Sequence, residues 1–263
     1  MNKIKAIFVD FDWTIYDHNL HSLNKSGVEA LKEAKSIGIK VIINSARTYF
    51  SLKGMENIFD KISFDGYSCS NGLIDLTDEK IIESLIIEEN LIKEVIKIAE
   101  DNKINYLLTN SKHSYLKVFD EQRMKDFYSI FNEPRGLDIS ELKSLNNIYA
   151  IQLFILEDQD YLFDSLKEKL YFYRFFDNAI EVQKMPRNKG DSVLNFMNYF
   201  KLKPEECIAI GDSNDDIKMF EKVKYGVCMG NGNDSAKSSA FYVTDTIEND
   251  GLKKALQHFK IIN

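Results

Sequence analysis

Residues 6–14 read Ala6-Ile7-Phe8-Val9-Asp10-Phe11-Asp12-Trp13-Thr14. Four apolar residues give way to two acids, which is typical of a strand buried on both faces whose carboxyl end opens into solvent. Two carboxylates at the end of a hydrophobic strand cost desolvation energy, and each raises the pKa of the other. The pattern predicts a cation or a set of donors between them, and Mg2+ suits because it prefers oxygen ligands. The alternative is that Asp10 and Asp12 only cap the next turn.

A strand, a helix and a second strand follow one another in the first 47 residues. A helical stripe begins at about Asn24, and Gly38 is placed to end it. A second predicted strand, residues 39–43, then leads into Asn44-Ser45-Ala46-Arg47. This order predicts a βαβ unit with a right-handed crossover, and a third strand edge near residues 66–71.

The same pattern returns near the other end of the chain. Residues 193–200 are predicted to be helical, and the strand 207–210 runs into Gly211-Asp212-Ser213-Asn214-Asp215-Asp216. Asp212 and Asp216 are four residues apart, so a turn or helix start could present both to one point. They could also be N-terminal helix acids that interact with the helix dipole. Ligands of open parallel sheets bind beyond the carboxyl ends of the strands, which is where these acids fall.

The stretch between these halves has a different pattern. Residues 106–108 and 115–118 flank a turn-like segment, which predicts an antiparallel hairpin, and helices and further short strands surround it. We therefore predict an α/β protein: a Rossmann-like, doubly wound parallel sheet with an inserted α+β cap domain. The expected parts are residues 1–80 and 188–263 for the core domain and residues 81–187 for the cap.

Composition narrows the class of protein. The chain has 263 residues, 44% of them hydrophobic, with 12 Gly and 3 Pro, which excludes a mainly disordered protein. The net charge of -7, without a basic block, argues against nucleic acid or an anionic membrane as the main partner. A small anionic substrate in a locally positive pocket remains compatible with this charge.

The cysteines and the N-terminal residues bear on the compartment. Cys69, Cys207 and Cys228 are an odd, widely spaced set without zinc-site or redox-motif spacing. No apolar run reaches the length of a signal peptide core or a membrane span. We expect a cytoplasmic protein. The oligomeric state cannot be inferred from the sequence.

Two further residue types could bind phosphate. Ser45 follows a predicted strand and offers a hydroxyl beside backbone N–H groups, and Lys189-Gly190 offers an ammonium at a helix start. Taken singly, such a serine is usually a turn residue and such a lysine a surface residue. The informative feature is the order of these residues along the chain: an acid pair, a hydroxyl, a lysine and an acid cluster.

That order, with a module between the hydroxyl and the lysine, resembles the haloacid dehalogenase-like hydrolases, and in particular the Cof-like phosphatases. The resemblance covers nearly the whole chain. Its motifs are Asp10-Phe11-Asp12-Trp13-Thr14, Asn44-Ser45-Ala46-Arg47, Asn71-Gly72, Lys189-Gly190, the acidic run 211–216, Met229-Gly230-Asn231-Gly232, Ala236-Lys237, Tyr242-Val243-Thr244-Asp245 and Asn249-Asp250-Gly251.

The resemblance implies a Mg2+-dependent phosphatase that acts through an aspartyl-phosphate intermediate. Asp10 would attack the phosphoryl group, and Asp12 would protonate the leaving oxygen and then activate water. Ser45 and Lys189 would hold the phosphoryl oxygens. The implied substrate is a small phosphorylated metabolite, either a sugar phosphate or a phosphorylated cofactor.

The resemblance also implies a metal site. Mg2+ would be held by Asp10, the Asp12 carbonyl and Asp212, with Asp216 orienting a ligand or a metal-bound water. The family usually has Asn where this chain has Asp215, so Asp215 would place an extra negative charge toward the phosphate.

Several residues are candidates for contacts with the substrate or the lid. Trp13 stands where the family usually has Gly, and we expect its ring to narrow substrate access. Arg47 and Asn71 are further candidates, while Lys184 and Arg187 are better explained as solvated charges. The four histidines, His18, His21, His113 and His258, show no metal-ligand grouping and receive no role.

Alternative functions remain open on the same residues. A response-regulator receiver also combines strand-end acids, a hydroxyl and a lysine, but it has about half this length and adjacent acids. A phosphomutase on the same fold would return the phosphoryl group to a sugar. A non-catalytic phosphate-binding or phosphoacceptor protein is the third alternative.

Overall fold

The structure is a computed structural model that describes residues 4–131 and 133–263. It divides into two compact units. The first, called the core unit, comprises Met1–Arg47, Glu56–Glu83 and Arg187–Asn263, and the second, called the cap unit, comprises Thr48–Met55 and Ser84–Pro186. Residues 48–55, assigned to the core domain from the sequence, thus group with the cap unit. The predicted domain boundaries stay a proposal.

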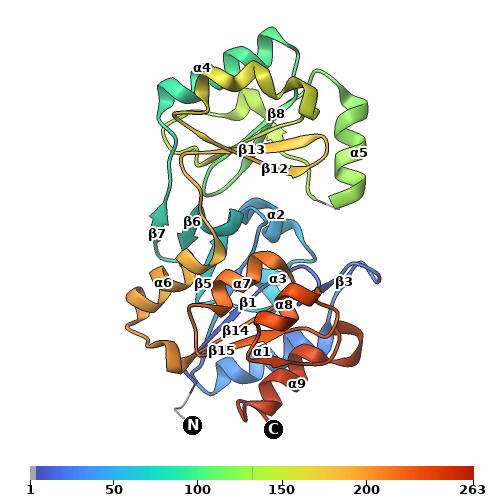
Figure 1. The fold of residues 1–263 in the computed structure, drawn as a ribbon, viewed down its shortest axis with the longest axis vertical. Coiled ribbons are helices and arrows are strands. Elements are labelled where there is room, and N and C mark those ends of the chain that lie inside the picture. Colours follow the sequence, from blue (N-terminus) through green and yellow to red (C-terminus); the bar gives the residue numbers. More distant parts are fainter. Residues whose placement is uncertain (1–3, 132) are drawn as a thin grey trace. The chain divides into compact units, whose positions relative to one another are not determined.

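One sheet with the strand order β16-β15-β14-β1-β4-β5-β6-β7 forms the centre of the core unit (Figure 1). Its strands are β1 (Ala6–Val9), β4 (Lys40–Asn44), β5 (Gly66–Cys69), β6 (Ile74–Leu76), β7 (Ile81–Ser84), β14 (Cys207–Gly211), β15 (Tyr225–Cys228) and β16 (Tyr242–Val243). Pairing is parallel from β16 through β5. β6 pairs antiparallel with β5, which the sequence did not predict.

Helices pack against this sheet because its short strands carry hydrophobic side chains on both faces. Ala6 and Phe8 of the fully buried β1 pack in one cluster with Val193 and Met219, which lie on α6 (Lys189–Phe200) and α7 (Asn214–Phe220). Since side chains alternate along a strand, the remaining β1 residues face the opposite layer. The other core helices are α1 (Lys25–Ser36), α3 (Ile58–Lys61), α8 (Asp234–Ser239) and α9 (Gly251–His258). This parallel, helix-covered sheet confirms the predicted α/β class.

The first helix shows how local sequence sets the boundaries. The Asn24 side chain accepts a hydrogen bond from the Gly27 N–H at 2.7 Å and caps α1. Gly38 follows the helix with a φ of 86°, a conformation in which glycine has no steric penalty. Both ends of α1 therefore lie where the sequence predicted them.

The cap unit is built on a second, mainly antiparallel sheet of order β10-β9-β8-β11-β13-β12. Its strands are β8 (Tyr106–Thr109), β9 (Ser114–Lys117), β10 (Leu137–Asp138), β11 (Ala150–Leu153), β12 (Tyr171–Phe176) and β13 (Ala179–Gln183). β8 and β9 form the predicted hairpin. Residues of α4 (Glu89–Asp101) pack on one face, and residues of α5 (Glu121–Phe131) pack in a separate cluster with Leu107 and Leu116. α2 (Tyr49–Gly54) also belongs to this unit.

Candidate active site

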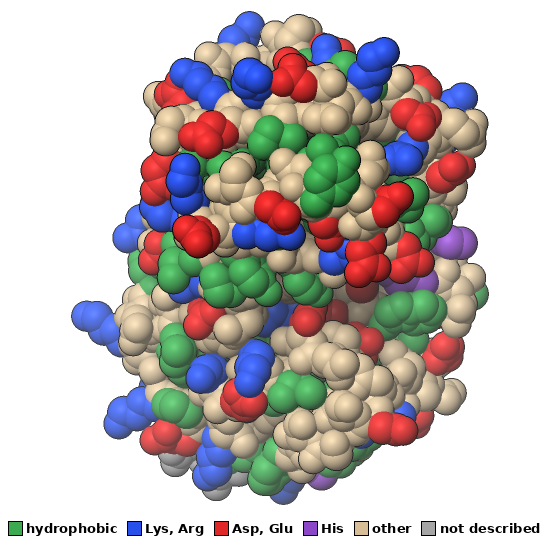
Figure 2. All heavy atoms as spheres, turned by 45° about the horizontal axis from the view of Figure 1, so that its top comes forward, with side chains coloured by type: hydrophobic (Ala, Val, Ile, Leu, Met, Phe, Trp, Pro, Cys, Tyr) green, Lys and Arg blue, Asp and Glu red, His purple; other side chains and the backbone are tan. Residues whose placement is uncertain are grey.

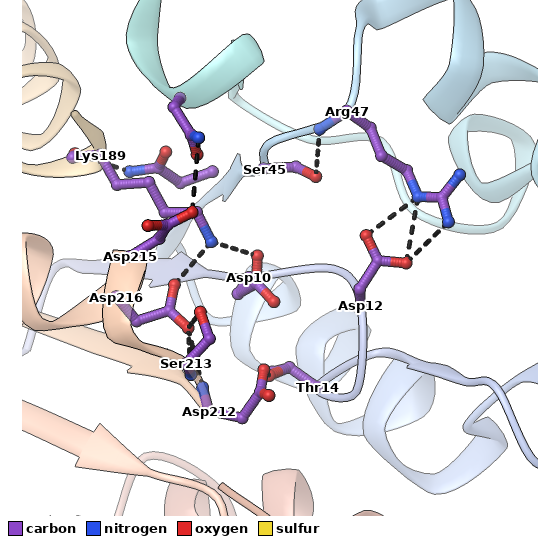
Figure 3. A network of polar contacts seen from close by, with 12 residues as sticks. Asp10, Asp12, Thr14, Ser45, Arg47, Lys189, Asp212, Ser213, Asp215 and Asp216 are labelled. Carbon is purple, nitrogen blue, oxygen red and sulfur yellow. Dashed lines mark hydrogen bonds and ion pairs between the residues drawn. The ribbon is translucent and has the colours of Figure 1, made fainter. Parts of the chain in front are cut away.

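The carboxyl ends of three neighbouring strands carry the candidate residues. β1 lies between β14 and β4, and Val9 is in register with Ile210 on one side and Ile43 on the other. Asp10, Ser45 and Asp212 each come directly after one of these strands, so parallel pairing brings them to one edge of the sheet. Figure 3 shows the resulting network.

Lys189 joins two acids from different motifs. Its Nζ lies 2.5 Å from Asp10 Oδ1 and 2.6 Å from Asp216 Oδ1. All three side chains are buried, and α6, capped by Asn188, begins at Lys189. Burial opposes the charged ammonium, but the Asp10 and Asp216 carboxylates outweigh it and raise the pKa of Lys189. The lysine is therefore a fixed positive charge beside Asp10.

Asp216 is oriented by the turn that precedes α7. Its Oδ2 accepts hydrogen bonds from the backbone N–H groups of Asp212 and Ser213, at 2.8 and 2.9 Å, and from the Ser213 hydroxyl at 3.0 Å. Gly211 is required here, because a Cβ at this position would collide with the Asp216 carboxyl group. These contacts leave Oδ1 of Asp216 directed at Lys189.

An acidic group at this edge suits a divalent cation. Among the described residues, carboxylate oxygens of Asp10, Asp212 and Asp216 all lie within 4.8 Å of one another. Burial raises the pKa of Asp10 well above its ordinary value, which Lys189 opposes and the neighbouring acids reinforce. Burial and Asp216 raise the pKa of Asp212 to about 7. Two buried acids and the half-buried Asp212 beside one ammonium favour a further positive charge, and hard oxygen ligands fit Mg2+.

The Asp12 carboxylate lies apart from that acidic group. Arg47 Nε and Nη2 donate to Asp12 at 2.8–3.0 Å, and His18 Nε2 lies 2.7 Å from Asp12 Oδ1. In Figure 3 the Asp12 side chain points toward Arg47 and away from Asp10. Burial would raise the pKa of Asp12, but His18 and Arg47 outweigh it and hold that pKa below its ordinary value. Arg47 and His18 therefore engage the Asp12 carboxylate, which is not part of the acidic group.

Ser45, Asn71 and Asp215 lie outside the acidic group. Ser45 is fully buried, and its Oγ accepts the Arg47 backbone N–H at 3.1 Å. Asn71, in a left-handed conformation with a φ of 52°, places its Nδ2 3.4 Å from Asp215 Oδ2. Asp215 is exposed and lies outside the acidic group. The two residues form a polar pair at the rim, not part of the buried cluster.

Trp13 and the two charged residues Arg187 and Lys184 each have a partner in the structure. Trp13 has a φ of 58°, its N–H donates to the Tyr16 carbonyl, and its carbonyl accepts from Asn231 Nδ2 at 2.9 Å. Arg187 Nε donates to the Gly72 carbonyl at 3.2 Å. In the cap unit, Lys184 pairs with Glu88 at 2.7 Å.

Two polar side chains near the site were not singled out from the sequence. Thr14 Oγ1 donates to Asp212 Oδ1 at 3.3 Å, and its place in the D-x-D-x-T motif was a signal for it. His18 lies outside every motif, so only the path of the chain after Asp12 brings it to the site.

Comparison with known proteins identifies the family. The sequence model of the haloacid dehalogenase-like hydrolases matches residues 7–256. The chain belongs to this family. A Bacillus subtilis 5-amino-6-(5-phospho-D-ribitylamino)uracil phosphatase is 24% identical over 97% of the chain and 96% of its own length. A chloroplastic endoribonuclease of Arabidopsis thaliana is 24% identical over 98% of the chain, which spans only 47% of that protein.

A solved structure gives the same result. The structure of a sugar phosphatase of haloacid dehalogenase subclass IIB is 26% identical, covers 98% of this chain and 100% of its own, and has a TM-score of 0.78. The family resemblance, the fold class and the assignment as a hydrolase are thereby confirmed.

Within residues 4–131 and 133–263, no helix has the length and apolar character needed to cross a membrane. On the face drawn in Figure 2, acidic and basic side chains are interspersed.

Proposed function

We propose that this hydrolase is a Mg2+-dependent phosphatase of a small phosphorylated metabolite and that it acts through an aspartyl-phosphate on Asp10. The observation that carries the proposal is the position of Asp10, buried at a strand end with Lys189 Nζ at 2.5 Å. A carboxylate held beside a fixed ammonium can approach a phosphoryl group whose negative charge would otherwise repel it. Activity in the cytoplasm is part of the proposal.

The reaction has two steps on this chain's residues. An Asp10 oxygen attacks phosphorus, the bond from phosphorus to the ester oxygen breaks, and the protonated form of Asp12 gives its proton to that oxygen. Asp12 then takes a proton from water as the water attacks phosphorus, which releases phosphate and restores Asp10. Lys189 and Ser45 hold the phosphoryl oxygens during both steps.

The metal would be held by Asp10, Asp212 and the Asp12 carbonyl, with Asp216 orienting a ligand. Bound Mg2+ would supply charge neutralisation for the crowded carboxylates and phosphoryl oxygens. The donor set supports this choice because burial and Asp216 raise the pKa of Asp212 to about 7, so a nearby cation would stabilise its carboxylate.

The names of relatives support a class of substrate. The Bacillus subtilis relative acts on a phosphorylated ribityl compound and the structural relative on sugar phosphates, by their names. We therefore propose a sugar phosphate or a phosphorylated cofactor precursor as the substrate. We propose neither a nucleic acid nor a membrane as a partner.

The test measures phosphate release from 4-nitrophenyl phosphate, with Mg2+ and with excess chelator. The parent chain should release phosphate only with Mg2+, and Asp10→Asn should reduce the rate to that of the uncatalysed reaction. Asp60→Asn, at an exposed position on α3, is the matched control and should match the parent. Release that continues in Asp10→Asn, or in chelator, would contradict the proposal.

A further inference from the structure

The Asp12 carboxylate is held by two side chains that reach it from different parts of the core unit. Arg47 follows β4 and is 7% exposed, and its guanidinium donates to both Asp12 oxygens. His18 follows β2 (Tyr16–Asp17), and its Nε2 lies 2.7 Å from Asp12 Oδ1. An ionised carboxylate only accepts hydrogen bonds, so the Nε2 of His18 is the donor.

The path of the chain after Asp12 fixes the position of His18. Backbone hydrogen bonds from Ile15 and Tyr16 to the Phe11 carbonyl, both 2.8 Å, turn the chain back on itself. β2 pairs with β3 (Ser22–Leu23), and the Asp17 carboxylate accepts the backbone N–H groups of Asn19 and Leu20 at the turn. His18 therefore sits on a short, internally bonded hairpin.

Aromatic rings hold the imidazole on two sides. The centroid of the Trp13 ring lies 5.0 Å from that of His18 with an interplanar angle of 37°, and the Tyr16 ring lies at 5.0 Å, edge on, at 82°. Aromatic pairs prefer these separations and tilts. The His18 side chain is 23% exposed, so the rings restrict its orientation but leave it partly accessible to solvent. The imidazole is thus oriented before any ligand arrives.

The donors are distributed unequally over the two Asp12 oxygens. Within the described residues, Oδ1 accepts from His18 and from Nε and Nη2 of Arg47, whereas Oδ2 shares the Arg47 Nε hydrogen. The Asp12 side chain is 28% exposed, so it is not closed off from solvent. Crowding at Oδ1 leaves Oδ2 as the oxygen with room to carry a proton.

We propose that His18 is a positioning residue that fixes the Asp12 carboxyl group, so that Oδ2, the oxygen with fewer donors, exchanges a proton with the leaving oxygen. The inference rests on the proposed function, because it assigns the oxygen that performs the Asp12 step. In this role, His18 does not contact the substrate. Its effect passes through one hydrogen bond to Oδ1 and the ring contacts that orient it.

The test uses two substrates of similar size that differ in their need for an acid. 4-Nitrophenyl phosphate has a stable phenolate leaving group, whereas 4-nitrobenzyl phosphate has an alkoxide leaving group that must be protonated. His18→Leu removes the donor. His18→Gln keeps one, because its amide nitrogen occupies nearly the position of the imidazole Nε2. His21→Asn, on the same hairpin, exposed and with a φ of 48° that Asn accepts, is the control.

His18→Leu should lower kcat/KM for the benzyl ester by roughly ten- to a hundredfold and for the aryl ester by less than about threefold. His18→Gln should recover most of the loss, and His21→Asn should behave as the parent. Adding His18→Leu to Asp12→Asn should leave the ratio of the two substrates unchanged, because the acid is already absent.

Other outcomes would overturn the inference. Equal losses on both esters would indicate a structural role only. A faster benzyl ester reaction in His18→Leu would mean that His18 restrains Asp12 from the leaving oxygen. Failure of His18→Gln to recover activity would exclude the hydrogen bond as the cause. The proposed function fails separately, if Asp10→Asn retains activity on the aryl ester.

Discussion

The core unit and the cap unit each bury carboxyl groups, but they balance them differently. In the core unit, Asp10 and Asp216 both bond to the buried Lys189 ammonium. In the cap unit, Glu181 on β13 is 8% exposed and accepts a hydrogen bond from the neutral Gln183 amide at 2.7 Å. Burial, only partly offset by Gln183 and Gln152, raises the pKa of Glu181 to about 7.

The difference separates two uses of a buried acid. A carboxyl group surrounded by amides lowers the free-energy cost of its burial by holding a proton, and it then acts as a neutral polar group. A carboxylate beside an ammonium has a charged partner for its anionic form, although burial still raises the pKa of Asp10, and a cluster of such acids attracts a cation. In the proposed mechanism, the core arrangement supplies the carboxylate that attacks phosphorus.

The largest expected effect comes from removing the Lys189 ammonium group from the core unit. Lys189→Met leaves Asp10 and Asp216 buried without their partner, which should lower the free energy of unfolding by about 3–5 kcal/mol. Urea denaturation without Mg2+ measures this, and phosphate release should be lost. The control, Lys218→Met, removes an exposed lysine that pairs with Glu221 at 3.1 Å and should change stability by less than about 0.5 kcal/mol. Similar stabilities for the two variants would mean that Lys189 does not balance the acids.

Glu181→Gln tests the cap side through pH. The pKa of Glu181 is about 7 in the folded state, above the unfolded value, so the folded chain binds more protons and its stability falls as pH rises to about 7. Glu181→Gln should not show this loss. The difference in free energy of unfolding between Glu181→Gln and the parent should therefore favour the variant by up to about 3 kcal/mol more at pH 8 than at pH 5. Urea denaturation at both pH values measures the gain.

A matched variant controls for the general effect of losing an acid. Glu168→Gln, at an exposed cap position, should show the same difference from the parent at both pH values. If Glu181→Gln also showed no dependence on pH, Glu181 would be ionised in the folded state and the contrast with the core would disappear.

Mg2+ should stabilise the core unit measurably, because it binds the folded acidic group. At a concentration about a hundred times its Kd, the gain is about 2.7 kcal/mol, which a thermal unfolding curve detects as a rise in Tm. Asp212→Asn should remove most of that rise, while Glu181→Gln should keep it. A rise in Tm that survives in Asp212→Asn would place the cation elsewhere.

The smallest expected effect concerns access to the core site. Trp13→Gly relieves a left-handed residue, a gain of about 1–2 kcal/mol that the lost contact with the His18 ring offsets in part. We expect a severalfold rise in kcat/KM for large phosphate esters relative to small ones. Lys201→Gly, at another left-handed position with a φ of 55°, relieves similar strain and should leave the size preference unchanged. An unchanged preference in Trp13→Gly would remove the access hypothesis.

The sequence was informative where chemistry follows strand ends. Asp10 and Asp212 could be placed at one edge because short apolar strands and parallel pairing dictate it. The contact between Lys189 and Asp216 could be anticipated only as proximity, since its geometry depends on the turn that Gly211 permits. The His18 contact with Asp12 could not be predicted, because it requires the β2–β3 hairpin, whose two-residue strands leave little periodic signal.

Trapping a phosphoryl group on Asp10 is the most direct test of the proposed mechanism. The enzyme is mixed with 4-nitrophenyl phosphate and Mg2+, quenched in acid within the first turnovers and digested for peptide mass analysis. The proposed mechanism predicts one phosphoryl group on the peptide that contains Asp10 and none in Asp10→Asn. Phosphate bound to another residue, or turnover with no trapped phosphoryl group after quenching at several times, would contradict it.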